Sequence, residues 1–425
     1  YESTYDSSEK VFVKGVGNYG GSRIILLKTS EKCGENLQWK VQDKVLTIYG
    51  TGDMSWDTDE APWSEQNISS VVVEEGVTSI AENAFQGKII SQISLPSTLK
   101  KIGSSAFAEC VDLESITLPD GLTSIGASAF RDCEKLTSIE IPDSVVSIDR
   151  AAFWGCEKLS SIKLSKNLKC IEGSLLEDCK SLTSVEIPDG VTSIEGSVFE
   201  GCQALTTVKI PKTVTSIGFE AFRYCDNLVN IEIPEGVTTI KGRTFFGCTE
   251  LKNLVLPDGL EQIGECAFCG CDSLSAIEIP AKVSSIDPYR TFDAKNLTVI
   301  NVAVENKSYS SVDGVLFNKD QSELIAYPAG KKGTSYTVPK NVRKIGSYAF
   351  SADSMLEKVK LQEGVESIGD HSFYDSKKLN AISIPKSVKE IADYAFSEGN
   401  LDVGDVYYAG SKEDWAKIQI GKENE

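Results

Sequence analysis

The chain has 425 residues, 41% of them hydrophobic, and its 62 acidic residues outnumber the 43 basic ones for a net charge of −19. This hydrophobic content can fill a continuous core. The acidic surface disfavours nucleic acid and anionic membranes, which bind clustered Lys and Arg. No apolar run is long enough to span a bilayer, so we expect no membrane insertion.

Residues 1–31 belong to no repeat, and VFVKGVG and SRIILLK predict two strands around the turn-forming NYGG. Residues 32–76 predict an N-terminal cap, beginning with a hairpin of LQWKV and KVLTIYG. Trp56 and Trp63 follow in a polar loop. The first layer of a stack has no neighbour above it, so we expect these tryptophans to cover it.

A 23-residue unit then organises most of the chain. In 214–236, VTSIGFEAFRYCDNLVNIEIPEG, apolar residues fall at positions 1, 4, 8, 9, 12, 15, 18 and 20, with Pro at 21 and Gly at 23. Repetition at a fixed period of this size predicts a solenoid, in which each unit hides its apolar face by stacking on its neighbours. Ten units span 77–300 and three more span 342–402.

Each unit predicts three local structures. Positions 15–21 predict a strand with positions 18 and 20 inward and 17 and 19 outward, and positions 1–5 predict a second extended piece. Positions 6–12 are too short for a regular helix and suit one helical or 3₁₀ turn that seats Phe inward. Stacked coils would align the strands into a parallel sheet. The predicted fold is an α/β repeat solenoid with terminal caps.

Residues 301–341 interrupt the repeat, and GVLFN and ELIAYP around KDQS predict an inserted hairpin. The hairpin either carries a specific contact or buries only its own small core, and it either bends the solenoid or continues it. Residues 403–425 predict a C-terminal cap with a short helix. Ser411 would be its N-cap with Asp414 in a capping box, and Trp415 and Ile418 would share one face.

The unit L-x-x-I-x-I-P-x-x-V-x-x-I-G-x-x-A-F-x-x-C resembles the leucine-rich repeat of BspA-like bacterial surface proteins, also called the Treponema pallidum type, over 77–299 and 342–402. The resemblance implies a right-handed leucine-rich-repeat superhelix, export to the cell surface, and adhesion or binding to host proteins, with no catalytic residues. We therefore expect a secreted or cell-surface protein. The sequence begins at Tyr1, so we expect that a signal peptide has been removed.

Eight cysteines recur at position 12 of successive units. They are Cys110, Cys133, Cys156, Cys179, Cys202, Cys225, Cys248 and Cys271. A ladder of disulfides is one alternative, but Asp353 and Ser376 take the same slot in later units. We expect free, buried thiols that act as small apolar packers. The cluster of Cys266, Cys269 and Cys271 lacks a fourth ligand, so we predict no metal site.

We predict no catalytic residues and no cofactor. A triad would require His371, the single histidine, which occupies position 7, a slot filled elsewhere by Ser105 or Glu220. We interpret His371 as a solvated surface residue. Paired carboxylates of the glycosidase type remain possible among the 62 acids, but no particular pair stands out.

Two sets of outward residues are candidate binding sites. At position 19 the charge alternates along Glu140, Lys163, Glu186, Lys209 and Glu232. This pattern indicates either a self-neutralising ladder that holds register or a polar binding strip on a concave face.

Aromatic residues form the second set. They are Trp154, Phe219, Tyr224 and Phe246, which lie in the segment at positions 6–12. Phe219, Tyr224 and Phe246 come from adjacent units. They indicate either one interface patch or lateral packing between turns.

The function that we predict is non-catalytic binding or adhesion at the cell surface, toward an extracellular protein or glycan, by a monomer. A purely architectural spacer in a larger surface protein is the alternative. A glycan-active enzyme is the third hypothesis, and it would need two carboxylates at hydrolase spacing inside a real pocket.

Overall fold

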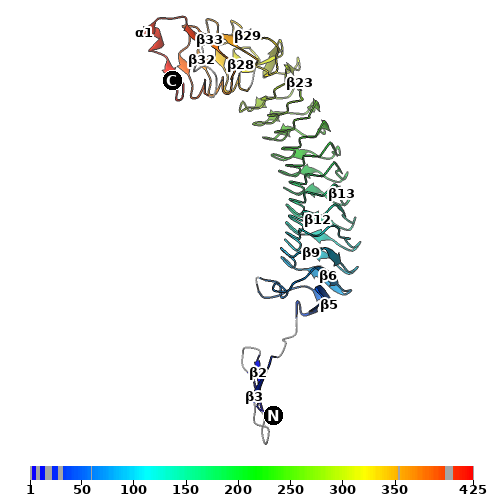
Figure 1. Cartoon of the computed structure of the whole chain (residues 1–425). Coiled ribbons are helices and arrows are strands. Elements are labelled where there is room, and N and C mark those ends of the chain that lie inside the picture. The colour runs from blue at the N-terminus through cyan, green and yellow to red at the C-terminus, as the bar shows by residue number, and fades with distance from the viewer. Residues whose placement is uncertain are drawn as a thin grey trace.

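The computed structural model describes residues 2–5, 10–14, 22–26, 32–58, 60–352, 355–397 and 405–424. Its main body is a parallel-strand solenoid of about 15 turns with almost no helix (Figure 1). Each regular coil has three parts. A strand at positions 17–19 forms the strand lane, a two-residue strand at positions 3 and 4 forms the short lane, and positions 6–12 form the turn lane.

Within each lane, the strands of neighbouring coils pair parallel and in register, so that residues at the same repeat position lie opposite each other. The strands of the strand lane before residue 303 are β6 (Ser70–Val73), β8 (Gln92–Ser94), β11 (Ser138–Glu140), β13 (Ser161–Lys163), β15 (Ser184–Glu186), β17 (Thr207–Lys209), β19 (Asn230–Glu232), β21 (Asn253–Val255), β23 (Ala276–Ile279) and β25 (Val299–Val302). Those of the short lane are β7 (Val77–Ile80), β9 (Lys101–Ile102), β10 (Ser124–Ile125), β12 (Ser147–Ile148), β14 (Cys170–Ile171), β16 (Ser193–Ile194), β18 (Ser216–Ile217), β20 (Thr239–Ile240), β22 (Gln262–Ile263) and β24 (Ser285–Ile286).

The N-terminal strands expected from the sequence are present. The first three strands, β1 (Glu2–Tyr5), β2 (Lys10–Lys14) and β3 (Ser22–Leu26), form an antiparallel sheet, and NYGG lies outside the described residues. The hairpin of β4 (Asn36–Gln42) and β5 (Val45–Asp53) follows, and β5 pairs with both β6 and β7.

The turn lane differs from the predicted helical or 3₁₀ turn. The N–H of Phe107 donates to the carbonyl of Ala129 in the next coil at 2.8 Å, while the N–H of Ala108 closes a β-turn on Ser105 at 3.1 Å. Ser105 and Glu109 have positive φ angles of 52° and 61°. A left-handed residue at positions 7 and 11 breaks the helical path and points alternate N–H groups at the next coil. The prediction of helical turns is therefore wrong, and the solenoid is almost entirely β-structure and turns.

A column of phenylalanines forms the core beside the turn lane. The Phe at position 9 stacks on its neighbours with ring centroids 5.2 Å apart for Phe85 and Phe107 and 5.3 Å apart for Phe199 and Phe222. Trp63 extends the column at its N-terminal end, 5.6 Å from Phe85, and Trp56 packs edge-on against Trp63. Burial of such rings supplies most of the free energy that holds one coil on the next.

The turn lane follows the inner side of the bent solenoid and the strand lane the outer side. Hydrogen bonds link the turn lane without a break from the coil of Ser105 to that of Cys266, whereas strands β11 to β25 pair only in twos. In Figure 1 the labelled strands of the strand lane lie along the outer side of the bend. Figure 1 shows β29 and β33 along the outer edge, with β28 and β32 beneath them. The expected concave placement of the position-19 strip is therefore wrong.

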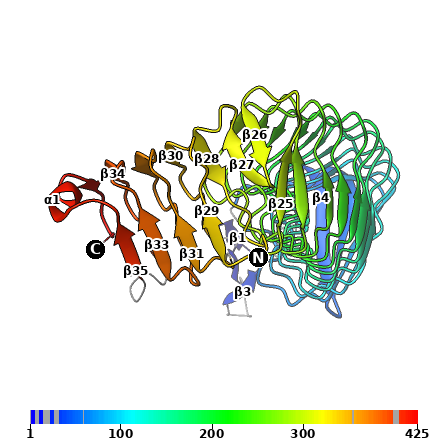
Figure 2. The same ribbon diagram turned by 90° about the horizontal axis from the view of Figure 1, so that it is seen from above.

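Residues 301–341 form the joint between two arms. The expected hairpin is present, because β27 (Val315–Asn318) runs antiparallel to β28 (Glu323–Ala326), and β26 (Tyr309–Val312) adds a third strand. Alternate residues of β27 face different cores, with Leu316 in the first and Phe317 in the second. The strand lane is not paired between β25 and the next described strand, and the second arm turns away from the first (Figures 1 and 2).

The second arm repeats the same architecture. Its strand lane contains β29 (Ser335–Thr337), β31 (Lys358–Lys360), β33 (Ala381–Ile384) and β35 (Asp405–Tyr408). Its short lane contains β28, β30 (Lys344–Ile345), β32 (Ser367–Ile368), β34 (Glu390–Ile391) and β36 (Gln419–Ile420).

The C-terminal helix α1 (Lys412–Trp415) begins with the predicted capping box. Ser411 and Asp414 each accept a hydrogen bond from the other's backbone N–H. Trp415 packs edge-on against Tyr408, and Ile418 is buried in the core of the second arm. Trp415 and Ile418 therefore cover the C-terminal end of the second core.

Candidate binding surfaces

Three of the predicted aromatic residues form one cluster on the turn lane of the first arm. The rings of Tyr224 and Phe246 meet edge-on at 5.4 Å. The guanidinium of Arg223 lies 4.7 Å from the Tyr224 ring and 5.5 Å from the Phe246 ring, and that of Arg243 lies 5.5 Å from the Phe219 ring. Such cation–π contacts hold the rings at the surface rather than in the core. We call these five residues the first-arm cluster.

Glycines make room for two of these rings. A Cβ on Gly247 would stand 2.6 Å from the Tyr224 ring, and one on Gly242 would stand 2.9 Å from the Phe219 ring. Each aromatic side chain therefore lies across the backbone of the next coil. Phe219 and Tyr224 nevertheless stay 40% exposed, so lateral packing uses only part of each ring.

Carboxylates fix the two arginines of this cluster. Glu220 accepts from Arg223 at 3.2 Å and from Arg243 at 3.4 Å, and Glu200 accepts from Arg223 at 2.9 Å. The side chains of Glu220 and Glu200 are largely buried, which reduces the screening of these ion pairs by water. The cluster is thus held in one arrangement before any partner arrives.

Trp154 does not belong to this cluster. It is 37% exposed and stacks with Arg131 of the preceding coil, whose guanidinium is 5.8 Å from its ring. Arg131 in turn pairs with Glu109 at 2.5 Å. Trp154 is a separate aromatic position on the same lane.

A second aromatic cluster lies beyond the joint, and the sequence analysis missed it. His371 stacks between Tyr348 and Tyr394 with ring centroids 4.9 Å apart on both sides. Tyr289 of the first arm meets Tyr348 edge-on at 4.9 Å, and Tyr374 packs against His371 at 5.5 Å. We call these five residues the second-arm cluster.

The prediction that His371 is a solvated surface residue is wrong. Its side chain is 22% exposed and its Nδ1 lies 2.8 Å from an oxygen of Asp370. The available signal was that position 7 is occupied by Tyr348, His371 and Tyr394 in three successive units. Identical positions in a stack become neighbours, so three rings in one slot predict a column.

The position-19 residues form two separate in-register pairs of opposite charge instead of one continuous ladder. Glu140 lies opposite Lys163 and Glu186 opposite Lys209, and both lysines form ion pairs with their neighbours. The side chains stay 62% to 72% exposed in these pairs, so water screens them strongly. Glu232 lies opposite Val255 instead of a lysine.

Comparison with known proteins identifies the repeat. The model for the BspA type leucine rich repeat region matches residues 60–140, 100–229, 215–330 and 326–403, in six copies of the repeat. These segments cover most of the chain. The chain belongs to the BspA-type leucine-rich-repeat family.

Several solved structures are similar to this BspA-type chain. A leucine-rich repeat protein from Bacteroides ovatus is 20% identical, with a TM-score of 0.62 over 88% of this chain and 99% of that one. A leucine rich cell surface protein from Faecalibacterium prausnitzii is 20% identical, with a TM-score of 0.41 over 99% and 98% of the two chains. The Treponema pallidum leucine rich repeat protein is 24% identical, with a TM-score of 0.30 over 57% and 90%. The Bacteroides structure supports the shared fold, and no curated protein matches the sequence.

The position-12 cysteines of this BspA-type chain are free and buried, as expected, but they do more than fill space. The thiol of Cys225 donates to the carbonyl of Phe199 in the preceding coil at 3.1 Å, and the hydroxyl of Ser376 makes the equivalent bond to Phe350 at 2.7 Å. Burial raises the pKa of the Cys110 thiol to about 12. Cys and Ser in this slot therefore donate the same hydrogen bond to the preceding coil, which explains why Ser can replace Cys.

The same BspA-type chain shows no metal centre in the part that the structure describes. No group of three or more His, Cys, Asp or Glu side chains is arranged to hold an ion there. Cys271 is fully buried and its thiol donates to the carbonyl of Phe245 at 3.1 Å, away from a shared site. Within the described ranges, no helix combines the length and apolar character needed to cross a bilayer.

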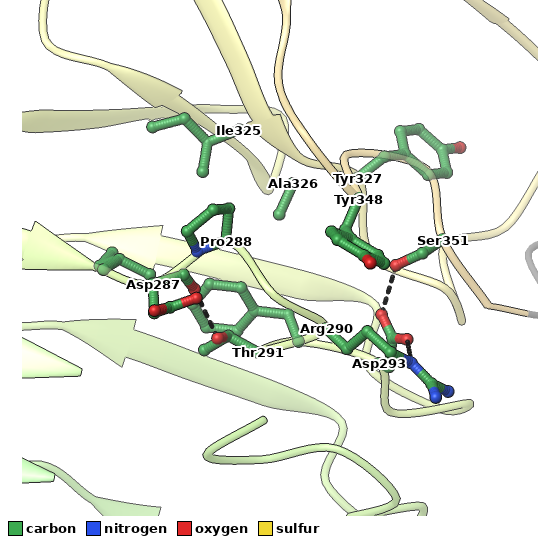
Figure 3. Close-up of a pocket in the computed structure, with 12 residues that line it drawn as sticks. Asp287, Pro288, Arg290, Thr291, Asp293, Ile325, Ala326, Tyr327, Tyr348 and Ser351 are labelled. Atoms are coloured by element: carbon green, nitrogen blue, oxygen red, sulfur yellow. Dashed lines mark hydrogen bonds and ion pairs between the residues drawn. The ribbon is translucent and has the colours of Figure 1, made fainter. Parts of the chain in front are cut away.

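The cavity at the joint of the BspA-type chain is nearly filled by its own side chains (Figure 3). Its volume is about 10 Å³, which leaves no room for a ligand. Inside it, the hydroxyl of Ser351 donates to Asp293 at 2.5 Å and Nε of Arg290 donates to the same carboxylate at 2.7 Å. These side chains hold the two arms together rather than forming a site.

Proposed function

We propose that this BspA-type protein is a non-catalytic binding protein, secreted or held at the cell surface, that recognises an extracellular protein through the inner side of its bend. The observation that carries the proposal is the placement of both aromatic clusters on the turn lane, one on each arm. Exposed aromatic side chains beside arginines are the residues that most often dominate the energy of protein interfaces.

The arrangement favours a partner that contacts both arms. Tyr289 and Tyr348 touch across the joint, so the second-arm cluster begins at the end of the first array. The first-arm cluster lies on the coils that begin at Val214 and Val237, and Tyr289 lies on the coil that begins at Val283. A partner on the inner side would meet a curved row of aromatic groups that ion pairs and stacking have already ordered, which lowers the entropy lost on binding.

The test uses substitutions that the array itself provides. Phe219→Ser, Tyr224→Asp and Phe246→Ala install the residues found at the same repeat positions in Ser104, Asp132 and Ala108. The triple variant and the wild type are immobilised and exposed to separate purified extracellular-matrix proteins. We expect at least one matrix protein to bind the wild type and the triple variant to lose at least about tenfold in affinity for it, because truncated hot spots cost about 2 kcal/mol or more.

The control substitution lies on the other lane. Val255→Thr removes an exposed apolar side chain at position 19 and installs the residue of Thr117. It should leave the affinity unchanged. Equal binding by the wild type and the triple variant, or a loss with Val255→Thr, would remove the first-arm cluster from the proposal. Trp154→Ala, measured separately, tests whether that isolated tryptophan contributes.

A second candidate function, glycan binding, is supported by the strand lane of the second arm. Outward side chains of β29, β31, β33 and β35 line a hollow of about 590 Å³. Hydroxyl and amide groups of Ser335, Thr337, Asn380 and Ser383 surround it, and Tyr407 offers an exposed ring. Such groups suit a polyhydroxylated ligand. Binding to mucin glycans that is lost with Tyr407→Ala, but kept in the first-arm triple variant, would favour this candidate.

The position-19 strip remains a weaker proposal. The charges of Glu140, Lys163, Glu186 and Lys209 already neutralise one another, so a partner would have to compete with these pairs. Glu232 is the member of the strip best placed to meet a basic group on a partner. If Glu232→Gln and Lys209→Gln both leave every measured affinity unchanged, the strip acts only to hold register.

A further inference from the structure

One unit of the array contains two additional cysteines, at repeat positions where the other units have other residues. Cys266 and Cys269 occupy positions 7 and 10 of the unit that begins at Leu260 and form a Cys-Ala-Phe-Cys sequence. Position 7 is Ser128 in another coil and position 10 is Ala108 in another. Neither cysteine is therefore needed to build the turn lane, in contrast to the recurring donors at position 12.

The turn lane brings the two thiols together. The N–H of Cys269 donates to the carbonyl of Cys266 at 3.2 Å, which closes a β-turn and places the two cysteines at its two ends. The ends of a β-turn lie within about 7 Å between Cα atoms, and disulfides span about 4.4–6.8 Å between Cα atoms. A disulfide can thus form in this turn with little movement of the backbone.

The surroundings of this pair differ from those of every position-12 thiol. The interaction with the Cys269 thiol lowers the pKa of Cys266 despite burial, and the positive charges of Arg290 and Arg243 act in the same direction while Glu265 opposes them. Burial is the main cause that raises the pKa of thiols such as Cys110 and Cys202, and neighbouring carboxylates add to the rise. Low-pKa thiols in electropositive surroundings are the ones that react as thiolates.

The pair also keeps a small contact with solvent. Cys266 is 3% exposed and Cys269 5% exposed, whereas the position-12 cysteines are fully buried. So little exposed surface excludes the approach of a protein disulfide and leaves a small molecule such as a peroxide as the oxidant. The two observations, paired thiols in a turn and a restricted opening, select the class of oxidant.

We propose that Cys266 and Cys269 are a peroxide-reactive dithiol that closes reversibly to an intramolecular disulfide. The Cys266 thiolate attacks the terminal oxygen of a hydroperoxide, so that an S–O bond forms and the O–O bond breaks; the leaving alkoxide or hydroxide takes up the proton that Cys266 had released and departs as alcohol or water. The Cys269 thiol then attacks the sulfenic sulfur, an S–S bond forms, the S–O bond breaks and water leaves with the proton of Cys269. The two sulfurs together lose two electrons and the peroxide gains them, and an external dithiol restores both thiols.

The test treats the full chain with hydrogen peroxide, blocks remaining thiols with an alkylating agent and maps the peptides by mass spectrometry. We expect the peptide that contains both cysteines to lose two hydrogen atoms while the position-12 thiols are alkylated only after unfolding. Cys170 is the internal control, because it is more exposed but its pKa is raised to about 11. We expect Cys266 to react at least about tenfold faster than Cys170, since thiolate population changes tenfold per pKa unit.

Two variants separate the roles of the two thiols. Cys266→Ser should abolish the disulfide and leave Cys269 unoxidised. Cys269→Ala should stop at the sulfenic acid of Cys266, which a dimedone probe traps. Absence of the mapped disulfide in the wild type, oxidation of Cys170 at the same rate, or no dimedone adduct in Cys269→Ala would each overturn the proposal.

Discussion

The hydroxyl of Ser351 donates a hydrogen bond of 2.5 Å to the carboxylate of Asp293, and this contact joins the two arms of the solenoid. Asp293 belongs to the last coil of the first array and is buried, and Ser351 belongs to the first phenylalanine-bearing turn of the second. Arg290 holds the same carboxylate. A buried polar network therefore stabilises the joint, in addition to the apolar side chains that β27 contributes to the cores of both arms.

The first prediction concerns the pH dependence of this network. Burial raises the pKa of Asp293 above its ordinary value of 3.8, although hydrogen bonds from Arg290 and Ser351 oppose the shift. The pKa of this carboxyl is higher in the folded state than in the unfolded state. Its contribution to stability is therefore complete at pH values below the unfolded-state pKa, and it is lost as the pH rises through the folded-state pKa. The stability of the wild type relative to Asp293→Asn should therefore fall as pH rises from about 4 toward neutrality, measured as urea midpoints.

A matched control for this prediction has the opposite sign. Hydrogen bonds from Lys166 lower the pKa of the exposed Asp143, so its contribution is present above the unfolded pKa and is lost as pH falls. The wild type should lose stability relative to Asp143→Asn on acidification. The same slope for both carboxylates would contradict the assignment of Asp293 as a residue whose carboxylate is penalised by burial.

The second prediction concerns the donor slot at position 12. Cys225→Ser keeps a hydrogen bond to the carbonyl of Phe199, as Ser376 does to Phe350, whereas Cys225→Ala loses it. We expect Cys225→Ala to be less stable than Cys225→Ser by about 1 kcal/mol, the usual net contribution of a buried hydrogen bond. Urea unfolding followed by circular dichroism measures the difference. Equal stability of the two variants would reduce the slot to simple packing.

The third prediction concerns the phenylalanine column. Phe222 stacks on Phe199 at 5.3 Å and on Phe245 at 5.7 Å. Phe222→Ala should cost about 3–5 kcal/mol because it leaves a cavity between two fixed coils. Phe222→Leu should cost clearly less, since Leu176 fills the same slot in another unit. Thermal and urea melts measure both, and a similar loss for the two variants would show that ring stacking, not volume, decides this site.

The fourth prediction concerns the exposed ion pairs of the strand lane. Lys163 and Glu140 pair across β11 and β13 but both remain mostly exposed. Lys163→Gln should leave the urea midpoint unchanged within error, at both low and high salt, because solvent screens exposed pairs and side-chain ordering offsets their attraction. A salt-dependent loss of stability would instead show that the ladder holds the strands in register.

The repeat made much of this architecture predictable. Positions that recur at one period meet their own copies in the next coil, so Phe107 and Phe130 could be expected to stack and Glu140 to face Lys163. The free thiols, the joint hairpin and the Ser411 capping box follow from equally local patterns. The first-arm cluster could also be predicted, because its three aromatic residues lie in adjacent coils at repeat positions where most other units have small or polar residues.

Other features depend on contacts that no single unit contains. The helical turn predicted for positions 6–12 is wrong, because alternate N–H groups of this segment donate to the next coil and not along a helix. His371 was misjudged because its surroundings come from Tyr348 and Tyr394, one coil away on each side. The electrostatic influence of Arg290 on Cys266 likewise comes from the neighbouring coil.

The sequence by itself determined the period, the parallel register and the inward residues of this BspA-type protein, because each follows from the pattern within one unit and its repetition. The tertiary structure alone decided the direction of the curve, the bend at the joint and the contact of Tyr289 with Tyr348. These depend on how strand pairing differs between the lanes and on how β27 divides its side chains between two cores. Such differences add up over many coils, so no single unit reveals them.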